Sequence, residues 1–211
     1  MTVTILAIVF LASYLMGTIP WGFIIGKLKG VDIRNHGSGN IGATNVTRII
    51  GKPWGIFCFA IDFSKGLLPV VIVKILFPAV FFLSATQVSI AIILAVVGTV
   101  LGHIYPVFLG FKGGKGISTG TGALVAITPL AIVCGLIAWV VVFKAFKYVS
   151  LASIIAAIIV SIMSFVLSYA GIYPIYPILL YFIALLALFA IYKHKSNIKR
   201  LLDGTENSFK K

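Results

Sequence analysis

Seven apolar runs constrain the fold of this chain more than any other feature of its sequence. Hydrophobic residues make up 61% of it and charged residues only 10%, whereas a soluble domain carries about a quarter charged residues. Most runs reach the roughly 20 residues with which a helix crosses a bilayer, and none alternates like a membrane β-barrel strand. We therefore predict an all-α integral membrane protein, a single polytopic membrane domain over residues 1–211. The runs lie near residues 2–26, 54–77, 84–104, 117–127, 129–146, 149–168 and 174–192.

The distribution of lysine and arginine predicts the membrane topology of these helices. The connections between the second and third runs and between the sixth and seventh contain neither residue. Because basic loops stay in the cytoplasm, every basic cluster falls on that side only if the stretch 117–146 turns at Thr128-Pro129, where proline interrupts a helix. This predicts about seven transmembrane helices, one of them short, with the N-terminus outside and the C-terminus cytoplasmic. An arrangement with five or six crossings violates the charge rule. The cytoplasmic segments are then the loops 27–53 and 103–117 and the tail 193–211.

The run 117–127 is too short to cross the bilayer. At 1.5 Å per residue it spans about 16 Å. The backbone groups at its inner end need partners from the protein, because lipid supplies none. We therefore expect a partial crossing whose buried end is covered by other parts of the chain.

The net charge of +13 arises from 17 basic and four acidic residues. Positive cytoplasmic loops and contacts with anionic lipid headgroups account for most of it. Nucleic acid is not expected as a partner, because no soluble basic domain is available to hold it. An anionic substrate is the sharper interpretation, and the polar motifs decide between the two.

The first cytoplasmic loop contains the segment SGNIGATNVTR, residues 38–48. Its glycines permit backbone conformations in which successive N–H groups point at one concavity, an arrangement that binds anions. Arg48 adds a planar fork of donors that suits phosphate, and a helix over residues 44–50 would direct its N-terminus at the same anion. A flexible interfacial loop is the alternative interpretation of this segment alone.

The second loop contains GHIYPVFLGFKGGKGISTGTG, residues 102–122. GGKG resembles a phosphate-binding loop, but the Walker pattern fails. Leu109 stands where its first glycine belongs, and Gly116 stands where Ser or Thr would ligate magnesium. Lys115 nevertheless lies among three glycines directly before a predicted helix start at Ile117, which combines a cation, backbone donors and a helix N-terminus. Two donor-rich segments without acids on one face favour an anion site over two ordinary turns.

The third segment is IYKHKSNIKRLLDG, residues 191–204. His194 and Asn197 are three residues apart, so they share a face of a helix. The apolar and basic positions around them predict an amphipathic helix at the membrane interface, which ends at Asp203-Gly204.

Several further polar residues lie in or near the apolar runs. Asp62 and Lys65 stand three residues apart inside the second run, where ionisable groups are costly unless paired, so we expect them to pair with each other. Ser150 and Ser153 lie at the start of the sixth run, where serine often only caps or packs a helix. His103 is expected in a loop.

These segments predict a site for a phosphate-bearing ligand at the level of the lipid headgroups. No acid lies beside a Ser–His pair in them, as a nucleophilic triad requires, and the HxxxxD pattern of many glycerolipid acyltransferases follows none of the three histidines. An enzyme with this sequence would therefore act by positioning and charge neutralisation. A transporter of anions or phosphate esters is the main alternative, although it would bind near the bilayer midplane between broken helices. A non-catalytic membrane scaffold is the third interpretation.

In their order along the chain, SGNIGATNVTR, GHIYPVFLGFKGGKGIST and HKSNIKRLLDGTE resemble the three cytoplasmic motifs of the bacterial acyl-phosphate:glycerol-3-phosphate acyltransferases, the PlsY family. The resemblance runs from the first apolar run to the tail. It implies transfer of a fatty acyl group from acyl phosphate to the 1-hydroxyl of sn-glycerol 3-phosphate. The products are lysophosphatidic acid and inorganic phosphate, in the first step of phospholipid biosynthesis. It also implies substrate assistance, in which a phosphate oxygen takes the hydroxyl proton, and this agrees with the missing carboxylate base.

The resemblance also implies roles for individual residues. Arg48 and Lys115 would be catalytic, because they would neutralise the two phosphates and the charge that develops at the carbonyl. His194 and Asn197 would hold glycerol phosphate together with a serine, for which we prefer Ser153 over Ser150. The remaining substrate-binding positions lie in the first two segments and are Ser38, Gly39, Asn40, Gly42, Thr44, Asn45, Gly113, Gly114 and Gly116.

The expected setting follows from the same resemblance. Acyl phosphate and glycerol 3-phosphate are the substrates, the lipid bilayer is the other partner, and no nucleic acid, cofactor or metal is expected. The protein is expected to be a monomer in the bacterial cytoplasmic (inner) membrane, with its active site on the cytoplasmic face.

Overall fold

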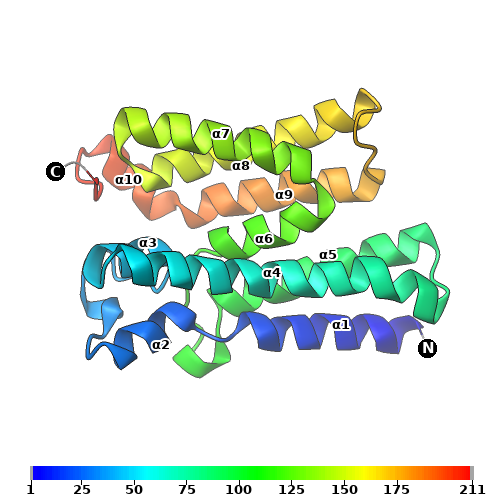
Figure 1. Ribbon diagram of the computed structural model, residues 1–211, viewed down its shortest axis with the longest axis horizontal. Coiled ribbons are helices and arrows are strands. Elements are labelled where there is room, and N and C mark those ends of the chain that lie inside the picture. Colours follow the sequence, from blue (N-terminus) through cyan, green and yellow to red (C-terminus); the bar gives the residue numbers. More distant parts are fainter. Residues whose placement is uncertain (1, 210–211) are drawn as a thin grey trace. The chain divides into compact units, whose positions relative to one another are not determined.

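The computed structural model describes residues 2–209, and within this range it contains helices joined by turns and loops (Figure 1). The all-α prediction is therefore confirmed, and the last two residues of the predicted tail lie outside the described range. The helices are α1 Thr2–Gly17, α2 Trp21–Leu28, α3 Ala43–Ile49, α4 Lys52–Phe81, α5 Ala85–Ile104, α6 Ile117–Ile127, α7 Pro129–Phe146, α8 Val149–Tyr169, α9 Pro177–Lys193 and α10 Lys195–Leu202, with 3-10 turns η1 Ile33–Asn35 and η2 Val107–Leu109.

The prediction of about seven membrane helices, one of them short, is confirmed. By length and composition, five stretches of residues 2–209 can cross a membrane, and α9 with α10 makes a sixth that is bent by 55°. The first stretch, Val3–Leu28, joins α1 and α2. The short apolar helix α6 begins and ends where the sequence predicts, directly before the break at Thr128-Pro129.

The chain divides into two compact units, one ending at Ala126 and the other beginning at Ile127. In the first unit α1 and α4 both pack against α5, and α3 packs against α4. Figure 1 shows α1, α4 and α5 lying lengthwise together, with α2 and α3 at the end opposite the α4–α5 hairpin. A glycine lets α5 approach the end of α1 closely. A Cβ at Gly102 of α5 would lie only 2.8 Å from the backbone nitrogen of Thr18, the residue after α1.

In the second unit α8 packs against both α7 and α9, and α10 contacts α8 and α9. Where α7 begins, the buried hydroxyls of Thr128 and Ser164 lie 3.2 Å apart. Pro129 occupies the first turn of α7, where its missing N–H costs no hydrogen bond. The predicted turn at this proline is therefore built into the start of a new helix.

The buried end of α6 is covered by a lysine from another helix. Lys74 of α4 donates from Nζ to the backbone oxygen of Ala126 at 2.7 Å. A cation at a helix C-terminus satisfies a carbonyl that has no partner within the helix and lies at the negative end of the helix dipole. Lys74 thus supplies one of the partners that this end of α6 was expected to need, and sequence analysis missed it.

Candidate active site

Asn45 closes the first loop from inside. Its Nδ2 donates to the backbone oxygens of Ile33 at 3.0 Å and His36 at 3.1 Å, and its Oδ1 accepts the Ser38 N–H at 3.0 Å. The side chain is only 1% exposed. Because both amide hydrogens are used by the loop itself, the contribution of Asn45 is to shape the backbone that carries Ser38.

The remainder of the loop combines a strained turn with a short helix. Gly39 has φ of +68°, a conformation that favours glycine. Asn40 accepts the Gly42 N–H through Oδ1 at 2.8 Å, and α3 begins at the next residue. Thr44 lies in the first turn of α3 and Arg48 in its last turn, where it is half-buried and makes contacts of its own. The predicted loop-to-helix transition is confirmed.

The first loop rests on a small apolar core. Ile41 and Val46 pack in one buried cluster with Ile25, Ile33 and Cys58. Since Cys58 belongs to α4, this cluster fixes the loop against the first membrane-spanning turns of that helix.

An ion pair stands beside this loop. Asp32 accepts from Arg34 Nη2 at 2.7 Å, and Lys27 Nζ lies 3.4 Å from the same carboxylate. The hydrogen bond from Arg34, together with the contact to Lys27, holds the pKa of Asp32 well below its usual range. Asp32 therefore stays ionised and partly neutralises the charge of Arg34.

The glycine-rich second loop folds back on the last turn of α5. The N–H of Gly113 donates to Ile104 O and the N–H of Gly114 to His103 O, each at 3.0 Å. A Cβ on Gly113 would lie 2.5 Å from Pro106 Cδ, and one on Gly114 would lie 2.8 Å from the His103 ring carbon Cδ2. Both glycines are thus required for close approach. Their amides are occupied by α5, so a role in substrate binding would come from the position they give the loop.

Lys115 follows at the end of this loop. It is half-buried and has contacts of its own, and Gly116 has φ of +77° directly before α6. The helix start at Ile117 lies at the predicted residue. The loop is fixed to the first span as well, because Val107 N donates to Thr18 Oγ1 at 2.8 Å.

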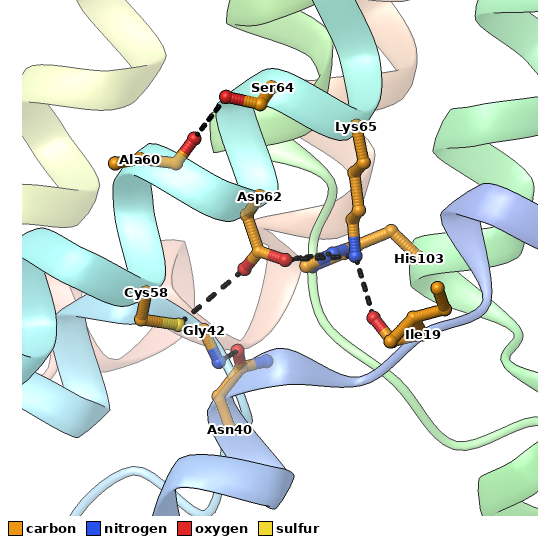
Figure 2. Close-up of polar contacts among 9 residues, drawn as sticks. All are labelled: Ile19, Asn40, Gly42, Cys58, Ala60, Asp62, Ser64, Lys65 and His103. Carbon is orange, nitrogen blue, oxygen red and sulfur yellow. Dashed lines mark hydrogen bonds and ion pairs between the residues drawn. The ribbon is translucent and has the colours of Figure 1, made fainter.

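His103 contradicts its prediction as a loop residue. It lies in the last turn of α5 and is 5% exposed. Asp62 and Lys65 pair as predicted, with 2.8 Å between Lys65 Nζ and Asp62 Oδ1. Figure 2 shows His103 beside this pair. The loop begins only after Ile104, at the C-cap residue Tyr105.

In the second unit His194 stands at the bend between α9 and α10. It is 3% exposed, and its Nδ1 lies 2.8 Å from the Ala190 backbone oxygen. Because a carbonyl only accepts, Nδ1 must carry the proton in this contact. His194 has a further contact of its own, and its role toward substrate stays a prediction.

Glu206 is the residue of this unit that sequence reasoning did not assign. Its Oε1 accepts from Ser150 Oγ and Asn197 Nδ2, each at 2.7 Å, and its Oε2 accepts from Arg200 Nε at 2.7 Å. Burial opposes the charge, but the hydrogen bonds from Asn197, Ser150 and Arg200 outweigh it and lower the pKa of Glu206. Its rarity was the available signal, since it is one of four acids in a strongly basic chain.

The two serines of the sixth span differ in their contacts. Ser150 donates its hydroxyl to Glu206, whereas Ser153 accepts the Trp139 indole N–H at 3.2 Å. Accepting from Trp139 leaves the Ser153 hydroxyl hydrogen to another acceptor. The preference for Ser153 as the serine that contacts substrate stays a prediction.

Comparison with known proteins places these observations in a family context. A family model described as "Glycerol-3-phosphate acyltransferase" matches residues 7–204. Relatives of the same description include one from Aquifex aeolicus (strain VF5), 42% identical over 93% of this chain and 95% of its own. Another, from Desulfotalea psychrophila (strain LSv54 / DSM 12343), is 44% identical over 95% and 96%.

Solved structures show the same likeness in three dimensions. A crystal structure of PlsY, an integral membrane glycerol 3-phosphate acyltransferase, in its glycerol 3-phosphate form, superposes with a TM-score of 0.83 at 39% identity and covers 97% of this chain and 96% of that one. Its lysophosphatidic acid form superposes with a TM-score of 0.81 at 38% identity and covers 97% and 95%.

Proposed function

This chain belongs to the glycerol-3-phosphate acyltransferase family and is an acyltransferase, and from this premise we propose acyl phosphate as its donor. The reaction moves a fatty acyl group to the 1-hydroxyl of sn-glycerol 3-phosphate. The observation that supports it best is the match over nearly the whole chain to PlsY in a glycerol 3-phosphate form and a lysophosphatidic acid form.

The proposed chemistry needs no protein carboxylate. The 1-hydroxyl oxygen of glycerol 3-phosphate attacks the carbonyl carbon of acyl phosphate, and the bond from that carbon to the phosphate oxygen breaks. The hydroxyl proton passes to a phosphate oxygen of the substrate. Lysophosphatidic acid and inorganic phosphate leave. The protein contributes by holding the reactants in line and by stabilising negative charge at the carbonyl oxygen.

We assign the charge stabilisation to Arg48 and Lys115. Both are half-buried, so their charges are less screened than those of exposed residues. Arg48 lies in the last turn of α3, which follows the loop closed by Asn45, and Lys115 lies near the end of the loop that folds onto α5. Ser38, Gly39, Asn40, Gly42 and Thr44 are the proposed lining of the acyl-phosphate pocket.

The second unit is proposed to bind glycerol 3-phosphate. His194 would contact the substrate from the bend between α9 and α10. Asn197 is fixed by Glu206 and Ser153 by Trp139, so both present a defined orientation to a ligand.

The proposed location is the bacterial cytoplasmic membrane, with the N-terminus outside and the active site at the cytoplasmic face. Supporting this orientation, the loops that carry Arg48 and Lys115 are basic, whereas the short connection between α4 and α5, at the opposite end of the first unit, has no lysine or arginine. This is the asymmetry that sets orientation in a membrane.

The test is an assay of the purified protein with labelled glycerol 3-phosphate and either palmitoyl phosphate or palmitoyl-CoA. We expect labelled lysophosphatidic acid and equimolar phosphate release with palmitoyl phosphate only. Product from palmitoyl-CoA alone would refute the donor assignment.

A pair of neighbouring lysines tests the assignment of the cation. Lys115→Ala is expected to lower kcat/KM at least about 100-fold, as loss of one transition-state charge partner typically does. Lys112→Ala is the matched control, because Lys112 is exposed in the same loop, and its rate is expected within about twofold of wild type. Equal rates in both variants would remove Lys115 from the mechanism.

A further inference from the structure

A buried polar cluster of the first unit contacts the core beneath the first loop and Gly114 of the second loop. Asp62 is 1% exposed, Lys65 4% and His103 5%. Lys65 Nζ lies 2.8 Å from Asp62 Oδ1 and also donates to the Ile19 backbone oxygen at 3.1 Å. Figure 2 shows the two α4 side chains directed toward His103 and toward Ile19, in the break between α1 and α2.

One side of the cluster reaches the first loop. Asp62 Oδ2 accepts a weak hydrogen bond from Cys58 Sγ at 3.6 Å. Cys58 packs in the same buried cluster as Ile41 and Val46, the apolar residues on which the Arg48 loop rests. A substitution at Asp62 would therefore alter the contacts of Cys58, which lies one helical turn away beneath that loop.

The other side of the cluster reaches the second loop. His103 Nδ1 lies 3.7 Å from Asp62 Oδ1, a close contact that is too long for a hydrogen bond. The opposite edge of the ring lies against Gly114, where an added Cβ would collide with Nε2 and lie 2.8 Å from Cδ2. The His103 backbone oxygen also accepts the Gly114 N–H at 3.0 Å.

We propose that Asp62, Lys65 and His103 form a positioning network that holds the Arg48 loop and the Lys115 loop in register, with the His103 ring as the support of Gly114. The inference rests on the proposed function, which makes both loops substrate loops. These three side chains are buried behind the loops, so their contribution to the reaction is the placement of Lys115 and Arg48. A displacement of about 1 Å in such a group is enough to reduce a rate about 100-fold.

The charge pair is tested with Asp62→Asn/Lys65→Met, which removes both charges while keeping the volumes. Replacing a buried ion pair by neutral groups often leaves stability unchanged, whereas removing one partner does not. We expect a melting temperature near that of wild type and kcat/KM lowered at least about 10-fold. Ser64→Ala is the matched control on α4, since the Ser64 hydroxyl donates to Ala60 O at 2.8 Å and points away from the network (Figure 2).

The support of Gly114 is tested by a double-mutant cycle with His103→Ala and Gly114→Ala. Gly114→Ala alone is expected to lower kcat/KM about 100-fold, because its methyl group meets a fixed ring. In the His103→Ala background the same substitution is expected to cost less than about fivefold, because the ring is gone. Residues in contact show such non-additivity, and independent ones do not.

The double-mutant cycle tests the network even if the Asp62→Asn/Lys65→Met variant does not fold. An equal loss from Gly114→Ala in both backgrounds would overturn the network, as would full kcat/KM in the folded neutral pair. The turnover of the wild type with palmitoyl phosphate tests the proposed function separately, because only ratios among variants enter the cycle.

Discussion

Replacement of Glu206 should loosen the end of the chain that carries Asn197. The Glu206 side chain is 6% exposed and accepts three hydrogen bonds at 2.7 Å. A hydrogen bond to a charged group contributes about 1.5–3 kcal/mol, and the bond to Arg200 counts less because that side chain is partly exposed. Glu206→Gln keeps one acceptor oxygen and turns an amide donor toward Arg200, so we expect a loss of about 2 kcal/mol in unfolding free energy. Glu206→Ala removes all three acceptor contacts and is expected to lose about 4 kcal/mol.

Thermal unfolding in detergent measures this loss. For a chain of this length, 1 kcal/mol corresponds to about 2–4 °C in melting temperature, so Glu206→Gln is expected to melt about 4–8 °C below wild type. Asp203→Asn is the control, because it removes an exposed acid at the C-cap of α10, just before the segment that carries Glu206, and makes the same change in net charge. Equal melting temperatures for wild type and both Glu206 variants would refute the hydrogen-bonded cluster.

The dependence on pH supplies a second check. Hydrogen bonding lowers the pKa of Glu206 in the folded state, so its stabilisation is fully present above the ordinary glutamate value of about 4.3. As pH falls through the lower folded value, the carboxylate protonates and that stabilisation is lost. We expect the wild type to lose melting temperature below about pH 4.3 more steeply than Glu206→Gln.

Three further predictions concern the first unit. Gly113→Ala should lower kcat/KM about 100-fold, because its Cβ would lie 2.8 Å from Ile104 O, while Gly120→Ala, with nothing within 4 Å, should retain wild-type kinetics. Asn45→Asp should lower both melting temperature and activity, since a carboxylate would replace the donor that meets two backbone oxygens; activity equal to wild type would contradict the closed loop. Lys74→Met should lower the melting temperature by a few degrees without changing KM, because it uncaps the end of α6.

Much of this architecture follows from local rules that act on the sequence. Apolar runs of sufficient length must be helical in lipid, because every backbone group has to be satisfied within its own segment. Proline at position 129 ends one helix and begins the next, so the bounds of α6 and α7 could be predicted to the residue. The pairing of Asp62 with Lys65 follows as well, since two opposite charges three residues apart in a span have no cheaper partner.

The motifs identified the family, but they did not predict which hydrogen-bond partner each polar group has. The sequence treats the amides of Gly113 and Gly114 as donors for a ligand, whereas the structure commits them to α5 carbonyls. Which acceptor an N–H finds depends on chains brought together from distant positions, and spacing along the sequence does not encode that choice.

The sequence by itself determined that this chain is a bundle of membrane helices with three polar, basic segments and an acyltransferase signature. Only the tertiary structure decided that His103 lies buried behind Gly114, that Lys74 covers the end of α6 and that Glu206 gathers Ser150, Asn197 and Arg200. The physical reason is the distance along the chain over which each interaction acts. Helix formation and membrane insertion depend on neighbouring residues and composition, whereas these contacts form between residues that only folding brings within hydrogen-bond distance.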